Sequence, residues 1–249
     1  MDDFQYRNDL SQVFDDFLTM SLCAFSPNPR TGKSHDEDLY METIARYKAS
    51  ELRHNFPKML GALILEMEAR SLFGNDILGE YYELNLSKKK GKGQFFTPWP
   101  ICQFMASCLA DENTFERDEP LRIIDPSCGS GRMLLAGAKY NGTQQEYYGI
   151  DIDHTCVKMT AINLFLNGIF HGEVMCADAL MPNDFQVSYV LSFLPFGIFR
   201  ITEKEKSPLW HRYNSSFPLK REKPPKADIK LPSEMGDIQS SGASQLQLF

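Results

Sequence analysis

A strand, a tight loop, a helix and a second strand follow one another in the middle of the chain, and this order constrains the fold most strongly. Residues 121–124, Leu-Arg-Ile-Ile, are mostly apolar and two of them are β-branched, which favours a buried strand of a parallel sheet. Gly129 and Gly131 lie in the loop that follows, where the missing side chains let a ligand approach the backbone. Residues 132–138 are good helix formers, and residues 147–150 form the second apolar strand. The pattern is typical of a nucleoside cofactor site in an α/β fold.

Two carboxylates narrow the choice of cofactor. Asp151 ends the second strand about 20 residues after Gly131, where an acidic side chain can accept hydrogen bonds from ribose hydroxyls. Asp125 stands at the entrance of the loop, where it would repel a pyrophosphate but attract a cationic amino acid and a sulfonium. S-adenosylmethionine fits both positions. The alternative is an ordinary strand, turn and helix whose glycines serve only packing.

The loop resembles a known family when it is taken together with a Phe-Thr-Pro segment upstream. Two motifs are similar to those of the N6-adenine DNA methyltransferases of type I restriction-modification systems: Gly93-Gln94-Phe95-Phe96-Thr97-Pro98 and Asp125-Pro126-Ser127-Cys128-Gly129-Ser130-Gly131. The resemblance begins near residues 76–83 and extends to about Gly197, roughly half of the chain. It implies an α/β, doubly wound, Rossmann-like methyltransferase fold.

The resemblance also implies which residues bind S-adenosylmethionine. In the family, the Phe-Thr-Pro segment closes over the methionine end of the cofactor, and an acid after the third strand accepts a bond from the adenine amine. The cofactor-binding residues implied here are Phe96, Thr97, Pro98, Asp125, Ser127, Gly129, Gly131, Asp151, Ile152, Asp178 and Ala179. Without the resemblance, the Phe-Thr-Pro segment would be an aromatic staple before a helix, and Asp178 would be a turn residue.

The expected base-binding segment departs from the family. There, a fourth strand is followed by Asn or Asp, Pro, Pro, and Phe or Tyr; the Asn oxygen and a proline carbonyl accept the hydrogens of the adenine amine, and the aromatic ring stacks on the flipped base. The implied catalytic residues here are Leu194, Pro195 and Phe196, which follow a strand at residues 187–191, with Phe193 at the Asn position. Because a phenyl ring cannot accept this hydrogen bond, we expect a rate loss on the order of 10²- to 10³-fold. Phe193→Asn is expected to raise methyl transfer.

Composition and periodicity divide the chain into parts. We expect a helical region at residues 1–86, a polar linker at 87–93, an S-adenosylmethionine-binding methyltransferase-like domain at 94–206, and a largely disordered tail at 207–249. Within the helical region, helices are expected to start near Ser34 and Pro57. A doubly wound methyltransferase continues with three more strands, so the fold is expected to be truncated after the fourth, with residues 198–201 as one further candidate.

The net charge and the composition of the chain limit which molecules it is expected to bind. A net charge of −7 argues against nonspecific coating of nucleic acid. Two basic clusters are either phosphate contacts or solvated loops: Lys88, Lys89, Lys90 and Lys92, and Lys220, Arg221, Lys223 and Lys226. The six cysteines form no C-x-x-C pair, so reduced thiols and no zinc site are expected. Without an apolar run of about 20 residues or a signal peptide, we expect no membrane partner and a cytoplasmic location.

The end of the chain carries a separate signal. Gln245, Leu246, Leu248 and Phe249 resemble the peptide by which bacterial replication and repair proteins bind the sliding clamp. The alternative is a tail whose apolar end packs on its own domain.

Together, these features predict a DNA adenine-N6 methyltransferase-like protein of restriction-modification type, which methylates a flipped adenine if it is active. DNA and a separate specificity or methylase subunit are the implied partners. The alternative is a catalytically deficient accessory or decoy that binds S-adenosylmethionine or DNA and is tethered to the sliding clamp. A small-molecule methyltransferase would share the loop, but the Phe-Thr-Pro and Leu-Pro-Phe segments argue against it.

Overall fold

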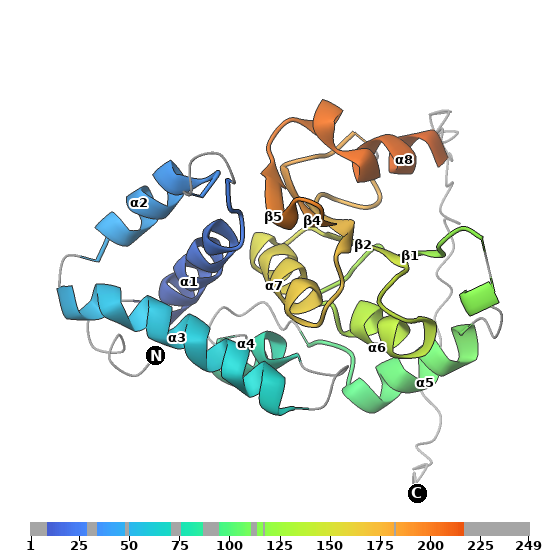
Figure 1. The fold of residues 1–249 in the computed structure, drawn as a ribbon, viewed down its shortest axis with the longest axis horizontal. Helices are drawn as coiled ribbons and strands as arrows, with labels where there is room; N and C mark the ends of the chain where they lie inside the picture. The colour runs from blue at the N-terminus through green and yellow to red at the C-terminus, as the bar shows by residue number, and fades with distance from the viewer. Residues whose placement is uncertain are drawn as a thin grey trace, which may run out of the picture. The chain divides into compact units, whose positions relative to one another are not determined.

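Three parallel strands form the first half of a five-stranded sheet in the computed structural model of this chain (Figure 1). β1 (Arg122–Asp125) leads through a loop into α6 (Arg132–Asn141), β2 (Glu146–Asp151) leads into α7 (His154–Leu166), and β3 (His171–Cys176) follows. The expected order of strand, loop, helix and strand is confirmed. α6 and α7 pack on the same face of the sheet, as expected for right-handed crossovers that advance in one direction.

The second half of the sheet is an antiparallel hairpin. β4 (Val187–Phe193) pairs antiparallel with β3, and β5 (Phe196–Ile201) pairs antiparallel with β4. Only residues 177–186 join β3 to β4, and a parallel return needs a crossover of about a dozen residues or more. The described strands therefore lie in the sequential order β1-β2-β3-β4-β5, without the order reversal of a doubly wound sheet. The α/β class is confirmed, and the strand order differs from the expected one.

Alternate residues of the strands point into two separate cores. Tyr147 and Val174 face α6 and α7, whereas Tyr148 and Met175 face a smaller cluster that contains Leu209. Leu209 belongs to α8 (Pro208–Ser216), which follows the short turns η2 (Thr114–Glu116) and η3 (Lys204–Lys206) in the chain. Helices thus cover both faces of the sheet.

α8 lies where the composition indicated a disordered tail. Its N-terminus binds Glu173, whose Oε2 atom accepts a hydrogen bond from the Leu209 N–H at 2.8 Å, and whose Oε1 atom accepts one from Ser207 Oγ at 2.5 Å. A carboxylate at a helix N-terminus pairs with N–H groups that have no partner within the helix. This tertiary contact could not be recognised from residues 207–216 alone.

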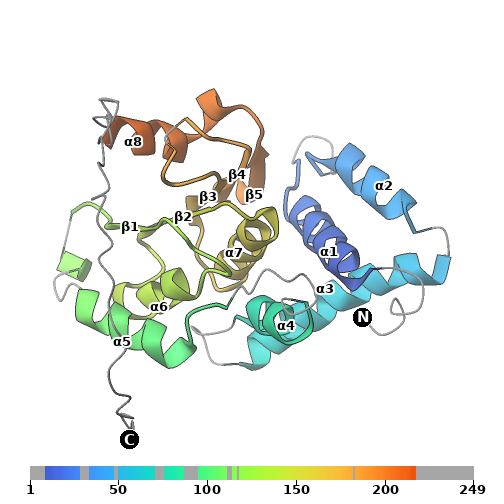
Figure 2. The same cartoon turned by 180° about the vertical axis from the view of Figure 1, so that it is seen from behind.

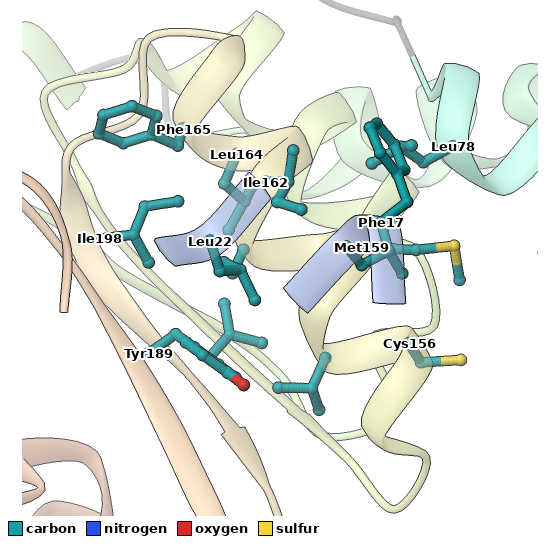
Figure 3. Close-up of a cluster of buried hydrophobic side chains, with 14 of the residues drawn as sticks. Phe17, Leu22, Leu78, Cys156, Met159, Ile162, Leu164, Phe165, Tyr189 and Ile198 are labelled. Carbon is teal, nitrogen blue, oxygen red and sulfur yellow. The ribbon is translucent and has the colours of Figure 1, made fainter. Parts of the chain in front are cut away.

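The N-terminal part is helical, as predicted, with α1 (Leu10–Ala24), α2 (Glu37–Ala45), α3 (Ser50–Ala69) and α4 (Ile77–Asn85). α5 (Trp99–Leu109) begins after Pro98, as expected from its two prolines. α1 lies beside α7 in both views (Figures 1 and 2), and their apolar side chains share the main core, which also includes Leu78 of α4 (Figure 3).

The expected start of the third helix is wrong, because α3 begins at Ser50 and contains Pro57 in its interior. Proline removes one backbone donor from a helix. Burial of Phe56, Leu63 and Met67 in the main core offsets this cost.

The structure describes residues 9–28, 34–47, 50–70, 76–86, 95–110, 114–116, 118–181 and 183–216, all within one compact unit, Met1–Pro218. The linker at 87–93, both basic clusters and the four clamp-peptide residues lie outside the described residues, so clamp binding stays a prediction. All six cysteines are free. None of the helices in the described ranges is long and apolar enough to cross a membrane.

Candidate functional site

The loop between β1 and α6, residues 125–131, is named the glycine loop here, and the sheet holds it in place. The Cys128 N–H donates to the Ile150 carbonyl at 2.9 Å, and the Gly131 N–H donates to the Cys128 carbonyl at 2.8 Å, which closes a turn. Gly129 and Gly131 have φ angles of +56° and +91°, in the region where other residues are strained. α6 begins directly after Gly131, so the loop lies at a helix N-terminus, as predicted.

Asp151 joins the end of β2 to the glycine loop. Its Oδ2 atom accepts a hydrogen bond from the Gly129 N–H at 2.8 Å, and its Oδ1 atom accepts one from the Asp153 N–H at 2.9 Å. Thr160 of α7 donates its hydroxyl to the Gly129 carbonyl at 2.8 Å. Since each carboxylate oxygen can accept more than one hydrogen bond, Asp151 retains capacity for a ligand hydroxyl.

Asp125 provides a second carboxylate at the same edge of the sheet. Its Oδ1 atom accepts a hydrogen bond from the Ser127 N–H at 3.0 Å. Burial raises the pKa of both Asp125 and Asp151, and the hydrogen bonds that they accept oppose the shift. Two carboxylates at the same edge of the sheet give it a negative potential, which favours a cationic ligand.

Asp178 lies at the end of β3, beside the end of β2. The Ala177 N–H donates to the Asp151 carbonyl at 3.0 Å, which brings the residues after the two strands together. Asp178 Oδ1 accepts a hydrogen bond from the Leu180 N–H at 2.9 Å, so the side chain also shapes its own turn. Ile152 is exposed, and the Ala179 carbonyl accepts a hydrogen bond from Tyr213. Asp125, Asp151 and Asp178 thus follow three adjacent parallel strands at their carboxyl ends.

The Phe-Thr-Pro segment lies against the glycine loop. A Cβ atom built on Gly129 would approach Phe96 Cδ1 to 2.8 Å, so the aromatic ring covers the backbone where the side chain is missing. Thr97, Asp125 and Ser127 border a pocket of about 410 Å³, whose other walls are Pro126, Asn141 and apolar residues of β1, α5 and α6. This volume is within the usual range of small-molecule sites. Pro98 forms the N-cap of α5.

These residues fit S-adenosylmethionine on two observations. The glycine loop lies at the N-terminus of α6 beside the ends of β1 and β2, and a pocket adjoins it at Asp125 and Ser127. The polar side chains at its rim are carboxylates, which suit ribose hydroxyls and a sulfonium better than a phosphate. No cluster of three or more metal-ligating side chains occurs among the residues that the structure describes.

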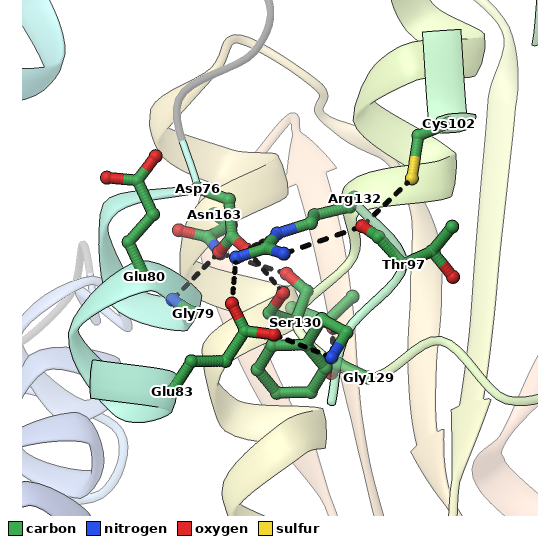
Figure 4. Close-up of polar contacts among 12 residues, drawn as sticks. Asp76, Gly79, Glu80, Glu83, Thr97, Cys102, Gly129, Ser130, Arg132 and Asn163 are labelled. Carbon is green, nitrogen blue, oxygen red and sulfur yellow. Dashed lines mark hydrogen bonds and ion pairs between the residues drawn. The ribbon is translucent and has the colours of Figure 1, made fainter. Parts of the chain in front are cut away.

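A buried polar network lies behind the glycine loop and could not be predicted from the sequence (Figure 4). Asp76, 2% exposed, accepts hydrogen bonds from Ser130 Oγ and Arg132 Nε, both at 2.5 Å, and from Asn163 Nδ2 at 2.7 Å. Arg132 also donates to Glu83 at 2.8 Å. Aspartate before a predicted helix indicates an N-cap, and Asp76 is one, but nothing in the spacing indicates that its partners lie in the glycine loop.

The implied catalytic residues lie at the opposite edge of the sheet. Leu194 and Pro195 form the two-residue turn of the β4–β5 hairpin, between the paired residues Phe193 and Phe196. This turn lies next to the start of β3, because Ser192 pairs with His171. At 3.3 Å per residue, the length of β3 separates it by about 17 Å from the edge that carries the three aspartates. The structure therefore does not bring Leu194, Pro195 and Phe196 together with the glycine loop.

Exposed aromatic rings in tilted and edge-to-face contacts flank the hairpin turn. Phe193, Leu194 and Phe196 are 53%, 83% and 51% exposed. Phe170 lies between the two phenylalanines of the turn, with ring centroids at 6.0 Å from Phe193 and 5.1 Å from Phe196.

Comparison with known proteins identifies the family of the chain. Residues 74–224 match the model of the family described as N-6 DNA Methylase. The chain is 30% identical, over 194 residues, to the type I restriction enzyme MpnII methylase subunit of Mycoplasma pneumoniae, covering 73% of this chain and 35% of that protein. It is 33% identical, over 122 residues, to a tRNA (guanine(10)-N2)-dimethyltransferase of Methanothermobacter thermautotrophicus, covering 49% of this chain and 35% of that protein.

A solved structure, a modification subunit of a putative type I restriction enzyme from Vibrio vulnificus, matches with a TM-score of 0.33 and 16% identity, covering 59% of this chain and 28% of that one. The chain spans about a third of the length of the curated relatives described above. The family model covers more than half of the chain and includes the glycine loop and all three carboxylates at the carboxyl edge. The chain therefore belongs to the N-6 DNA methylase family.

Proposed function

We propose that this chain binds S-adenosylmethionine at the carboxyl ends of β1, β2 and β3, and that it serves as the cofactor-binding part of a DNA adenine-N6 methyltransferase of restriction-modification type. The observation that carries the proposal is the convergence of Asp125 and Asp151 on the glycine loop, where Asp151 accepts the Gly129 N–H at 2.8 Å. Membership of the N-6 DNA methylase family supports the same reaction class.

Each side chain has a proposed role in holding the cofactor. When bound, S-adenosylmethionine supplies a methyl group activated by its sulfonium. Asp151 and Ile152 hold the ribose, and Asp125 and Ser127 face the cationic end. Asp178 accepts a hydrogen bond from the adenine amine, and Ala179 contacts the adenine. Phe96, Thr97 and Pro98 form the wall above the glycine loop. Gly129 and Gly131 give the loop its positive-φ turn, with Phe96 packed against Gly129 and Thr160 against Gly131.

The proposed cofactor site does not include the residues that would bind the flipped adenine. Leu194, Pro195 and Phe196 have no role in the proposed cofactor site, because the hairpin turn is at the opposite edge of the sheet. DNA and further restriction-modification subunits are the proposed partners, on the basis of the relative from Mycoplasma pneumoniae. Such subunits would supply the groups that hold the flipped adenine.

Thermal unfolding with and without S-adenosylmethionine tests the cofactor site. Ligand at a hundred times its dissociation constant should stabilise the fold by about 2.7 kcal/mol, and Asp125→Ala should abolish the shift. The reaction is then tested with tritiated S-adenosylmethionine, duplex DNA or tRNA, and candidate subunits of a type I restriction-modification system. We expect the label in N6-methyladenine of the DNA. Label only in tRNA would mean that the substrate is RNA and not DNA. The absence of a thermal shift with S-adenosylmethionine would overturn the cofactor assignment.

A further inference from the structure

Three segments of the chain converge on Asp76, which is a buried carboxylate outside the glycine loop. Ser130 comes from the loop, Arg132 from the first turn of α6, and Asn163 from α7, and all three donate hydrogen bonds to it. The Gly79 N–H donates to Asp76 Oδ1 at 2.8 Å, so the same side chain begins α4. The position of α4 is therefore tied directly to the position of the glycine loop.

Glu83, about two turns further along α4, makes a second connection. Its Oε2 atom accepts a hydrogen bond from Arg132 Nη2 at 2.8 Å, and its Oε1 atom accepts one from the backbone N–H of Phe96 at 2.7 Å. The Arg132 guanidinium lies 5.5 Å from the centroid of the Phe96 ring. A single helix thus holds the loop through Asp76 and the aromatic residue over Gly129 through Glu83.

The chemistry of these contacts favours one fixed arrangement. Arg132 is 8% exposed and lies between two carboxylates, so each of its contacts has a defined direction and little competition from water. Removal of one member would leave a buried charge without its partner. Apolar packing alone would allow the loop and Phe96 to shift relative to each other.

We propose that Asp76 and Glu83 are positioning residues, through which α4 holds the glycine loop and Phe96 in the arrangement that accepts S-adenosylmethionine. The inference rests on the proposed function, since it concerns the same cofactor. Neither carboxylate contacts the cofactor; they act through Ser130, Arg132 and Phe96.

Glu83→Gln is the sharpest test, and Glu80→Gln is its matched control. Glu80 lies on the same helix, but it is exposed and pairs with Arg70 at 2.9 Å, away from the network. Hydrogen exchange followed by mass spectrometry reports on peptides that cover residues 95–98 and 127–132, and calorimetry gives the dissociation constant of S-adenosylmethionine. We expect Glu83→Gln to raise exchange in these two segments and to raise the dissociation constant by about tenfold, with no change in α1 or β3. Glu80→Gln should change neither readout.

Other outcomes overturn the inference. Equal exchange in the two variants would mean that Glu83 does not position the segments, and increased exchange in all the described elements would mean that it only stabilises the fold. Asp76→Asn should affect the same two segments more strongly; if it does not fold, Glu83→Gln still decides. If the wild-type chain binds no S-adenosylmethionine, the proposed function fails, while the exchange data separately show whether α4 holds the loop.

Discussion

Asp151 Oδ2 accepts a hydrogen bond from the Gly129 N–H at 2.8 Å, so the end of β2 and the glycine loop fix each other's position. The carboxylate is thereby already oriented before a ligand arrives. An oriented group loses little conformational entropy on binding, which makes its contact with a ligand more effective. The same relationship explains why Asp151 must be changed conservatively if its charge is to be tested without disturbing the loop.

Asp151→Asn should weaken S-adenosylmethionine binding without unfolding the protein. The amide oxygen can still accept the Gly129 N–H, although the NH2 group cannot accept the Asp153 N–H as the carboxylate does. A neutral amide also binds ribose hydroxyls less strongly than a carboxylate does. Hydrogen bonds to charged groups contribute about 1.5–3 kcal/mol, so the dissociation constant should rise about 10- to 100-fold by calorimetry. Glu205→Gln, an exposed change outside the site, is the control. Unchanged affinity in Asp151→Asn would remove the carboxylate from the ribose contact.

Gly129→Ala should destabilise the fold and close the space under Phe96. The new Cβ would lie 2.8 Å from Phe96 Cδ1, and the φ angle of +56° is strained for alanine. We expect the free energy of unfolding in urea to fall by about 1–2 kcal/mol, and S-adenosylmethionine binding to weaken. Gly61→Ala is the control, because no atom lies within 4 Å of its added Cβ in α3; it should raise stability by about 0.5–1 kcal/mol. Equal effects of the two changes would contradict the close contact between Gly129 and Phe96.

The local elements could be predicted because their signals are local. The apolar run before Asp125, the positive-φ glycines and the helix formers after Gly131 each depend on a few neighbouring residues. The carboxyl-edge cluster of Asp125, Asp151 and Asp178 could also be predicted, because parallel strands end at one edge.

The rest depends on contacts between distant segments. The bond from Ser130 to Asp76 spans 54 residues, and no periodicity indicates it. The antiparallel direction of β4 follows from the short connection at residues 177–186. The family resemblance instead implies that the Leu-Pro-Phe segment follows a parallel strand. The capping of α8 by Glu173 is likewise visible only in the folded chain.

The stability of the fold should depend on pH through Asp76. Burial raises the pKa of Asp76 to about 6, from an ordinary value of 3.8, although Ser130 and Arg132 favour the ionised form. The folded state therefore binds this proton more tightly than the unfolded state does. Its stabilising contribution is complete below pH 3.8 and is lost as the pH rises through about 6.

Comparing the pH dependence of the free energy of unfolding in the wild type and in Asp76→Asn isolates the contribution of the Asp76 carboxyl group. Two pKa units correspond to about 3 kcal/mol, so the free energy of unfolding of the wild type should fall by about 2–3 kcal/mol relative to the variant between about pH 4 and pH 7. Urea unfolding at several pH values measures the difference. Parallel pH profiles of the two proteins would show that Asp76 does not titrate in this range.

Phe193→Asn tests whether the hairpin turn belongs to the reaction centre. The family resemblance predicts that asparagine at this position raises methyl transfer, whereas the structure places the residue at the end of β4, next to the turn and the start of β3. We therefore expect no increase in label transferred from tritiated S-adenosylmethionine to DNA, and an unchanged dissociation constant for the cofactor. Loss of the ring contact with Phe170 should lower the free energy of unfolding by about 1 kcal/mol.

Phe193→Leu is the matched control, because it removes the same ring without adding an amide. The two variants should transfer label equally and should differ little in stability. An increase in transfer that occurs with asparagine but not with leucine would contradict this expectation. It would mean that the amide reaches the adenine amine, and hence that the hairpin turn approaches the carboxyl edge of the sheet when DNA and the companion subunits are bound.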